Sequence, residues 1–374
     1  MYKKIALICI IFSMTFSLWA GAVPSLSGIS AQSFVVLDAR TNTVLYEHNA
    51  RNKMSMASTT KIMTAIIALE KLSEEQIVKI TPDMLKVEGT AMGLAAGDEI
   101  SVKGLLTGLL LESGNDAANA LAFHIAGSLE KFSTVMNQKA KDLGMSGSNF
   151  VTPSGLDSEQ HYTTAYDMAI LTSYSLKNPL FEEIVSTKKE KVTFFNPPKT
   201  VTYYNHNRLL SEMDGAIGVK TGFTKKSGRC LVSAARRNGA TVVTVTLKAA
   251  SDWSDHKQLT DYGFEEMIEI PLDTTLPKSI NVISSDKKEI EIQMNNDIKM
   301  TLPKSNNKII RQVCLPDFLY ARITKGDKVG EVRYYINDIL IQTEDVFASE
   351  SADISVRKLT FWENLKMKIA DFFS

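Results

Sequence analysis

The dipeptide Asn238-Gly239 lies between two β-rich runs, residues 230–235 and 241–247. Asn-Gly readily takes the two positive φ angles of a tight type I′ turn, so this pattern predicts an antiparallel hairpin. A third run of the same kind, residues 217–223, precedes the pair. Three such runs close together in sequence predict an antiparallel sheet in this part of the chain.

Two more β-like runs, residues 34–37 and 43–46, surround a turn near the N-terminus and predict a second hairpin. Between this hairpin and the later strands, apolar residues recur at helical intervals. Helices are predicted over residues 56–72, 102–111, 116–126, 132–143 and 165–177. We expect the early and late strands to join in one sheet with the helices packed on it, which is the α+β class.

The composition changes around residues 271–277, and residues 280–347 alternate short β-like runs with turns. This pattern predicts a separate small β domain. Beyond it, apolar and basic residues recur at the spacing of an amphipathic helix that lies on a membrane surface. The apolar set is Val356, Leu359, Trp362, Leu365, Ile369 and Phe372, and the basic set is Arg357, Lys358, Lys366 and Lys368. The alternative is a helix docked on its own domain.

Lys3 and Lys4 precede an apolar run, residues 5–19, which is followed by Ala20-Gly21-Ala22. These are the three parts of a secretory signal peptide, with cleavage expected after Ala22. The alternative is a retained membrane anchor, although the run is shorter than the ~20 residues that a span needs. Either way the protein is exported. The expected division is 1–22 signal peptide, 23–270 main domain, 271–348 small β domain and 349–374 terminal helix.

The 42 Lys and Arg residues equal the 42 Asp and Glu residues in number. Without excess positive charge the chain cannot hold a polyanion by counterion release, so nucleic acid is not expected as a partner. Because Cys9 lies in the signal peptide, Cys230 and Cys314 remain, and no disulfide framework is expected. The five histidines include no HExxH arrangement and no cysteine pair has zinc spacing, so no metal is predicted.

Ser58 and Lys61 form an SxxK pair at the start of the predicted helix over residues 56–72. Residues three apart on a helix share a face, so the lysine amine can reach the serine hydroxyl. Lysine can act as the base for a serine nucleophile where burial and nearby positive charge keep it partly neutral. The same spacing also begins at Ser128, Ser186, Ser254, Ser284, Ser285, Ser305 and Ser355. Ser58 differs because its apolar helix would hold both side chains rigidly.

Two further motifs are ambiguous when taken alone. Ser113-Gly114-Asn115 lies between two predicted helices, where it could add a hydroxyl and an amide to a site or simply cap the next helix. Lys220-Thr221-Gly222 ends a predicted strand. A cation beside a hydroxyl suits a carboxylate, and the glycine lets a ligand lie close along the strand. The alternative is an exposed strand end with a turn glycine.

In this order, the three motifs resemble the SxxK, SDN and KTG signature of penicillin-binding proteins and class A β-lactamases. Over about residues 33–347 the chain resembles the D-alanyl-D-alanine carboxypeptidases among the low-molecular-mass penicillin-binding proteins, especially their sporulation-associated Gram-positive branch. Residues 57–64, 108–122, 153–157 and 161–167 also carry the likeness. The resemblance implies a β-lactamase/transpeptidase-like α+β fold, a small C-terminal all-β domain and an enzyme that needs no cofactor.

The resemblance also implies the reaction, which is removal of the terminal D-alanine from peptidoglycan stem peptides that end in D-Ala-D-Ala. Ser58 would form the acyl-enzyme, Lys61 would be its general base and Ser113 would relay protons. The backbone amides of Ser58 and Phe223 would form the oxyanion hole, in which one donor is worth ~3 to 4 kcal/mol in a comparable site. β-Lactam antibiotics would be covalent inhibitors.

For substrate binding, the resemblance assigns Asn115 to the peptide, and Lys220 and Thr221, beside Gly222, to the terminal carboxylate. The site would lie outside the cytoplasm, in the cell wall or at the outer face of the cytoplasmic membrane. Residues 356–373 would make peripheral contact with that membrane.

The chain departs from the signature at Gly114, which replaces the aspartate of SDN, and carboxypeptidases of this type share that version. No clear counterpart exists of the acidic loop residue that class A β-lactamases use for deacylation, so a slow acyl-enzyme with penicillin is expected. His161 and Asp167 are interpreted as structural, because Lys61 already fills the role of base. The alternatives are a β-lactamase or D,D-endopeptidase on the same scaffold, and a catalytically silent wall-binding protein.

Overall fold

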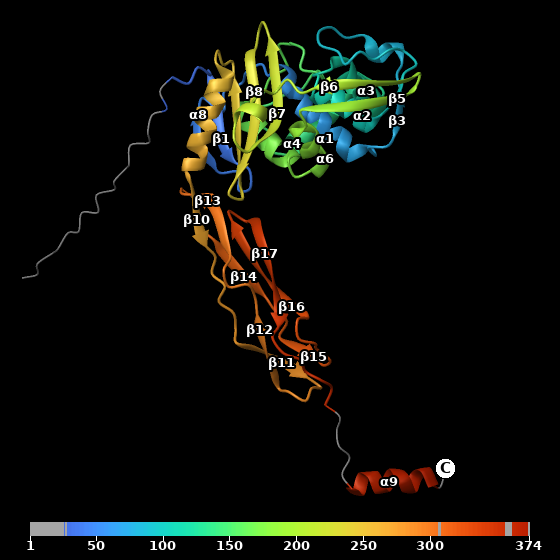
Figure 1. Cartoon of the computed structure of the whole chain (residues 1–374), viewed down its shortest axis with the longest axis vertical. Coiled ribbons are helices and arrows are strands. Elements are labelled where there is room, and N and C mark those ends of the chain that lie inside the picture. Colours follow the sequence, from blue (N-terminus) through green and yellow to red (C-terminus); the bar gives the residue numbers. More distant parts are fainter. Residues whose placement is uncertain (1–25, 27, 306–307, 356–360, 373–374) are drawn as a thin grey trace, which may run out of the picture.

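The structure is a computed structural model that describes residues 26, 28–305, 308–355 and 361–372. Figure 1 shows three parts along the chain. The first is a large domain of helices and strands (residues 28–266), and the second is an elongated domain of strands, called the β domain here (residues 267–355). The third is the terminal helix α9 (Phe361–Phe372).

A five-stranded antiparallel sheet forms the frame of the large domain, in the order β2-β1-β9-β8-β7. Its strands are β1 (Ser33–Asp38), β2 (Val44–His48), β7 (Ala216–Thr224), β8 (Gly228–Arg237) and β9 (Ala240–Leu247). Asn238 and Gly239 have φ angles of 48° and 75°, as a type I′ turn requires. The predicted union of the N-terminal hairpin with the later strands is confirmed, and β7 lies at the edge of the sheet.

Helices cover both faces of this sheet. Alternate residues of a strand point to opposite sides, and here both sides carry apolar residues that need a covering layer. Val35 and Leu37 of β1 pack with the main helical core, which includes α5 (Ala165–Ser175). Phe34 and Val36 pack on the other face with Leu259 of α8 (Asp252–Glu265). The predicted α+β class is confirmed.

The centre of the helical half is α1 (Lys61–Lys71), whose first eight residues are buried on every side. The helices around it are α2 (Val102–Leu110), α3 (Asn115–Ala126), α4 (Leu129–Asp142), α5 and α6 (Pro179–Ser186). Lys61, the first residue of α1, is therefore buried in the helical half of the domain. The short helices η2 (Pro82–Leu85) and α7 (Leu209–Glu212) lie in connecting segments.

A second sheet, with the order β3-β4-β5-β6, was not expected from the sequence. Its strands are β3 (Ile77–Lys79), β4 (Glu99–Ser101), β5 (Lys189–Asn196) and β6 (Pro198–Tyr204). β5 and β6 form a long hairpin that Figure 1 shows beside α2 and α3. This sheet buries the helical half on the side away from the main sheet, where Val192 and Phe194 join the core.

The β domain consists of strands, as predicted, and has a core of its own around Ile290, Val332 and Tyr334. Two strands pair as β10-β13, and the other six form a sheet in the order β14-β16-β17-β12-β11-β15. The strands are β10 (Met267–Pro271), β11 (Ser279–Ile283), β12 (Glu289–Gln293), β13 (Lys299–Pro303), β14 (Ile310–Cys314), β15 (Phe318–Tyr320), β16 (Lys328–Ile336) and β17 (Ile339–Ala348).

The predicted terminal helix is present from Phe361 to Phe372, and residues 356–360 of the prediction lie outside the described residues. Phe361 and Trp362 are 74% and 70% exposed. Figure 1 shows α9 away from both domains. No helix in the described part of the chain is long and apolar enough to cross a membrane.

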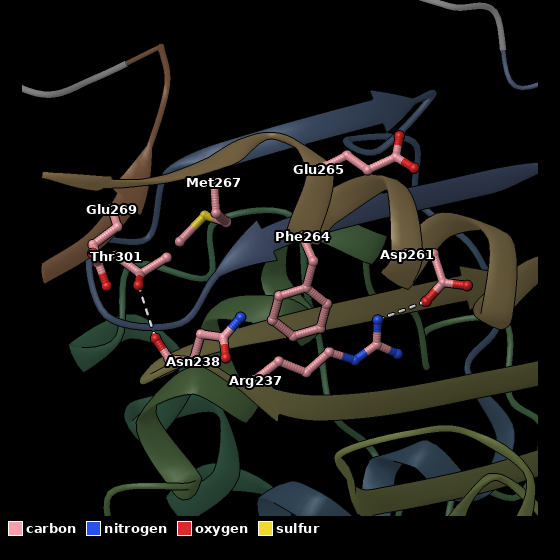
Figure 2. A pocket seen from close by; sticks show the side chains of 8 residues that line it. All are labelled: Arg237, Asn238, Asp261, Phe264, Glu265, Met267, Glu269 and Thr301. Atoms are coloured by element: carbon pink, nitrogen blue, oxygen red, sulfur yellow. Dashed lines mark hydrogen bonds and ion pairs between the residues drawn. The ribbon is translucent and has the colours of Figure 1, made fainter.

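A pocket of about 610 Å³ lies where the two domains meet. Figure 2 shows its lining, in which Arg237 pairs with Asp261 at 2.7 Å and lies over the ring of Phe264. Across the junction, the Thr301 hydroxyl donates to the Asn238 carbonyl at 2.8 Å. None of the predicted site residues lines this pocket, so it belongs to the domain junction rather than to the site described next.

Candidate active site

Ser58 lies on a 3₁₀ turn, η1 (Ala57–Thr60), which runs directly into α1. The sequence predicted a continuous α-helix from residue 56, and this is wrong at its first turn because Ala57 has a left-handed φ of 48°. In a 3₁₀ turn residues three apart align, so the predicted pairing of Ser58 with Lys61 survives. Lys61 Nζ lies 2.9 Å from Ser58 Oγ.

Lys61 is fully buried, and its amine has two partners besides Ser58. Nζ donates to Asn115 Oδ1 and to the Ser154 carbonyl oxygen, both at 2.7 Å. These two oxygens can only accept, so a neutral amine would bond both with its two hydrogens and keep its lone pair for the Ser58 hydroxyl. Burial, and next the charge of Lys220, hold the pKa of Lys61 well below its usual range. The arrangement suits a general base.

The Ser113-Gly114-Asn115 loop joins α2 to α3 and brings Asn115 to the lysine. Asn115 Nδ2 donates to the Glu88 carbonyl at 2.6 Å, which fixes the direction of the amide. Ser113 has a left-handed φ of 64° and is 8% exposed. Within the described part of the chain, its hydroxyl has no hydrogen bond to Ser58, Lys61 or another residue.

Gly114 is required by its neighbours. A Cβ there would lie 2.8 Å from Asp116 Oδ1 and 3.0 Å from the Met92 nitrogen. The Asp116 carboxylate accepts hydrogen bonds from the backbone N–H groups of Met92, Gly93 and Leu94. A side chain in the middle of the motif would disturb this contact, so the glycine lets Asp116 hold the backbone of residues 92–94.

The strand β7 carries Lys220, Thr221, Gly222 and Phe223 along the edge of the main sheet. Lys220 is 2% exposed, its Nζ donates to the Thr221 carbonyl at 2.9 Å, and burial lowers its pKa to about 7. A Cβ on Gly222 would lie 3.0 Å from the Ser58 nitrogen. The strand therefore passes directly against the turn that carries Ser58, and Phe223 is 66% exposed at its outer end.

Neither His161 nor Asp167 contacts Ser58, so the structure contains no Ser-His-Asp arrangement at this site. His161 Nε2 lies 2.8 Å from Thr60 Oγ1, and burial lowers the pKa of His161 to about 4. Asp167 accepts from the Gly147 backbone and the Ser148 hydroxyl. No group of three or more potential metal ligands was found among the described residues.

Sequence reasoning missed three contributors to this site. The Ser154 carbonyl contacts the lysine, Thr60 contacts His161, and Asp116 holds the backbone of residues 92–94 beside the Ser113-Gly114-Asn115 loop. Ser154 lies in a stretch that carried the family likeness, but a backbone carbonyl leaves no signal in a residue type. Asp116 directly follows the Ser113-Gly114-Asn115 motif, but its partners lie 22 to 24 residues earlier in the chain, so local spacing does not reveal them.

A serine hydroxyl bonded to a buried lysine whose pKa is held well below its usual range, beside an edge strand with its own buried lysine, defines a serine acyl-transfer enzyme of the penicillin-binding class. Residues 21–251 match the family model of D-alanyl-D-alanine carboxypeptidase, peptidase S11. Residues 270–353 match the C-terminal domain of penicillin-binding protein 5. The chain therefore belongs to the D-alanyl-D-alanine carboxypeptidase family, and it is a serine hydrolase of this type.

Individual relatives agree with this assignment. The chain is 31% identical to the D-alanyl-D-alanine carboxypeptidase DacF of Bacillus subtilis over an alignment of 355 residues that covers 91% of this chain and 90% of the relative. It is 31% identical to DacC of Escherichia coli over 92% of this chain and 90% of the relative. Among solved structures, DacD of Francisella tularensis superposes with a TM-score of 0.61 at 27% identity, covering 88% of this chain and 95% of that one.

The DD-transpeptidase of Streptomyces K15 also superposes with a TM-score of 0.61, at 33% identity. It covers 64% of this chain and 98% of its own length. The part shared with the K15 enzyme thus corresponds in extent to the large domain alone. The relatives that cover nearly the whole chain match both the large domain and the β domain. The predicted fold is confirmed for the large domain and for the β domain.

Proposed function

We propose that Ser58 is the nucleophile with which this D-alanyl-D-alanine carboxypeptidase removes the terminal D-alanine from peptidoglycan stem peptides. The observation that carries the proposal is the 2.9 Å contact of Ser58 Oγ with a lysine whose other two partners are acceptors. This leaves the lysine lone pair free for one proton, that of the serine hydroxyl. No cofactor takes part in the proposed steps.

In the proposed reaction, Ser58 Oγ attacks the carbonyl carbon between the last two D-alanines while its proton passes to Lys61. The negative charge that develops on the carbonyl oxygen is held by the backbone N–H groups of Ser58 and Phe223. The C–N bond then breaks, and the departing amine takes the proton from Lys61, with Ser113 as the relay. Water, deprotonated by the same lysine, cleaves the acyl-enzyme and restores Ser58.

The site has a helical wall, which carries Ser58, Lys61 and Asn115, and a strand wall, which is the edge strand β7. The substrate peptide would lie between these walls, along the free edge of β7. An edge strand offers unpaired backbone groups to an extended peptide, so main-chain hydrogen bonds can hold the stem. Asn115 would hold the peptide from the helical side. Lys220 and Thr221 would bind the terminal carboxylate, and Gly222 leaves room for it. A carboxylate beside Lys220 would favour its charged form and raise its pKa from about 7.

The predicted signal peptide, residues 1–22, lies outside the described residues. We propose that the protein is exported, because the cell-wall peptides on which this family acts lie outside the cytoplasm.

We further propose that α9 attaches the protein to the outer face of the membrane. Phe361, Leu365 and Ile369 recur every four residues and are 74%, 38% and 50% exposed. The proposed role of the β domain (residues 267–355) is to act as a spacer between α9 and the active site. Vesicle flotation with and without residues 356–374 tests attachment, and unchanged flotation would exclude it.

The deciding experiment measures free D-alanine released from a diacyl-Lys-D-Ala-D-Ala peptide by the mature protein and by Ser58→Ala. Release by the wild type alone, together with penicillin labelling of the wild type alone, would support the reaction and its nucleophile. Release that survives in Ser58→Ala would overturn the role of Ser58. A parallel assay with cross-linked dimer and with penicillin as substrates separates carboxypeptidase from endopeptidase and β-lactamase turnover.

A sporulation role is proposed on the sequence resemblance alone. Transcript timing during sporulation checks it, and expression confined to vegetative growth would contradict it.

A further inference from the structure

The peptide between Ala57 and Ser58 carries two groups at once. Its N–H is the Ser58 donor of the proposed oxyanion hole, and its carbonyl belongs to Ala57. A trans peptide is planar, so these groups point in opposite directions and turn together. Whatever fixes the Ala57 carbonyl therefore aims the Ser58 N–H. Ala57 has a left-handed φ of 48°, which an L-residue adopts only when its surroundings hold it there.

The Ala57 carbonyl is held by the hydroxyl of Thr60. Thr60 Oγ1 donates to it at 2.8 Å, and Thr60 is fully buried. A hydroxyl has a single proton, so the contact of Oγ1 with His161 Nε2, also 2.8 Å, requires the histidine to donate.

The other nitrogen of His161 settles which proton the ring carries. Its Nδ1 accepts from the Val151 backbone N–H at 2.9 Å, so the neutral ring has its hydrogen on Nε2. The ring is 3% exposed and meets Phe150 edge-on. The result is a chain of hydrogen bonds with one direction, from Val151 through His161 and Thr60 to the Ala57 carbonyl. Each bond in such a chain strengthens the next.

Gly155 explains why this carbonyl has no freedom on its other side. A Cβ on Gly155 would lie 1.9 Å from the Ala57 oxygen, so the backbone of residues 154–155 is packed against it. The same segment supplies the Ser154 carbonyl that holds Lys61. The turn that carries the nucleophile and the carbonyl that orients its base thus meet at one place.

We propose that His161 is a positioning residue that aims the Ser58 N–H at the oxyanion through Thr60 and the Ala57 carbonyl. It touches neither the substrate nor the Ser58 hydroxyl. The inference rests on the proposed function, because it needs Ser58 to be the nucleophile and its N–H to be a donor. Its effect falls on the transition state, so it predicts a change in acylation rate and kcat with little change in KM.

Thr60 and Thr59 provide a matched pair for the test. Both are buried, and Thr59 Oγ1 makes the same kind of bond to a carbonyl three residues back, that of Met56. That carbonyl does not belong to the Ala57–Ser58 peptide. Thr60→Val is expected to lower the rate of acylation by penicillin and kcat about 10- to 100-fold, less than or equal to the loss of a whole oxyanion donor. Thr60→Ser and Thr59→Val are expected to stay within threefold of the wild type.

His161 offers a second pair, because its two nitrogens can be replaced separately. The amide nitrogen of His161→Gln reaches the place of Nε2 and can donate to Thr60, whereas the oxygen of His161→Asn reaches the place of Nδ1 and can only keep the Val151 bond. His161→Gln is expected to acylate within about fivefold of the wild type, and His161→Asn to fall with Thr60→Val. The double variant Thr60→Val/His161→Asn should be no slower than Thr60→Val alone, because both break one chain.

The rate of acylation by penicillin, kcat and KM for D-alanine release, and the thermal midpoint are measured for all variants. Equal rates for the Gln and Asn variants, an unchanged rate in Thr60→Val, or a Thr59→Val loss as large as that of Thr60→Val would each overturn the inference. If Thr60→Val does not fold, Thr60→Ser and the two histidine variants decide. The wild-type rate reports the proposed function, whereas the ratios report this inference, so the two can fail separately.

Discussion

The two walls of the active site differ in how their side chains are held. On the helical wall, the Lys61 amine has three hydrogen-bond partners from three separate segments. On the strand wall, Lys220 Nζ bonds the carbonyl of its own neighbour, Thr221, and Phe223 is 66% exposed. The proposed base and nucleophile are thus held in place before substrate binds, whereas the exposed end of the strand wall would gain its contacts only when a ligand binds. Chemistry and binding should therefore respond differently to substitution.

The largest expected effect is on the helical wall. Lys61→Gln removes the proton acceptor and is expected to slow acylation of Ser58 by penicillin about 10³-fold, within the range for a general base. Lys71→Gln, at the exposed end of the same helix, is the matched control and should acylate at the wild-type rate. Stopped-flow measurement of penicillin acylation checks both. A rate for Lys61→Gln within tenfold of the wild type would mean that another group takes the proton.

The second prediction concerns the place where the walls touch. Gly222→Ala puts a methyl group 3.0 Å from the Ser58 nitrogen and should push the strand and the nucleophile turn apart. A displacement of about 1 Å at reacting groups can cost about 10²-fold, so kcat/KM for the peptide should fall about 10- to 100-fold. Gly104→Ala is crowded even more, by Ile100 at 2.8 Å and Val192 at 2.9 Å, but it lies near the start of α2 and its added methyl group meets none of the predicted site residues. It should lower the thermal midpoint and leave kcat/KM unchanged; an equal loss of activity in both would show a general packing effect.

The third prediction separates the two lysines by pH. Lys61 must be neutral to act as a base, so kcat/KM should rise with pH through its lowered pKa. The proposed binding of the carboxylate needs a charged Lys220, so kcat/KM should fall above pH about 7. In Lys220→Gln the falling limb should vanish. The rising limb should move to higher pH, because a charge that opposes protonation of Lys61 is gone. A pH profile of D-alanine release checks this, and a wild-type profile that stays flat from pH 6 to 9 would contradict it.

The sequence predicted the frame of the fold where local patterns were strong. Asn238-Gly239 marked a hairpin because its turn needs two positive φ angles, and the apolar residues of α1 marked a buried helix. The helix α8 left no clear pattern, because the residues that it buries include Asp255, His256 and Thr260. These polar groups are satisfied inside the protein, for example by the bonds of His256 to Ser233 and Thr246. Helical periodicity of apolar residues cannot show such a face.

The site was predictable to the extent that its function depends on side chains at fixed spacing. Ser58 and Lys61 met as expected even though their turn is 3₁₀ rather than α-helical. The left-handed φ of Ala57 and the Ser154 carbonyl were not predictable, because alanine does not mark such a conformation and every residue has a carbonyl. These backbone features arise from long-range packing, such as that of Gly155 against Ala57.

The smallest expected effect concerns how much the buried charge of Lys220 lowers the free energy of unfolding. Burial lowers the pKa of Lys220 to about 7 from its usual 10.5, so the charged form destabilises the folded state. Below pH 7 the lysine is charged both folded and unfolded, and the cost is present in full. Between about pH 7 and 10.5 the folded protein releases the proton that the unfolded chain still binds, so the free energy of unfolding rises with pH.

Lys220→Met should therefore raise the free energy of unfolding by on the order of 2 kcal/mol at pH 6, and this gain should shrink towards pH 10. The exposed lysine in Lys226→Met carries no such cost and should change stability little at any pH. Urea denaturation of both variants across this pH range checks the sign. A Lys220→Met variant that is less stable than the wild type at pH 6 would mean that the buried ammonium is held by more than its bond to Thr221. The strand wall would then be as preorganised as the helical one.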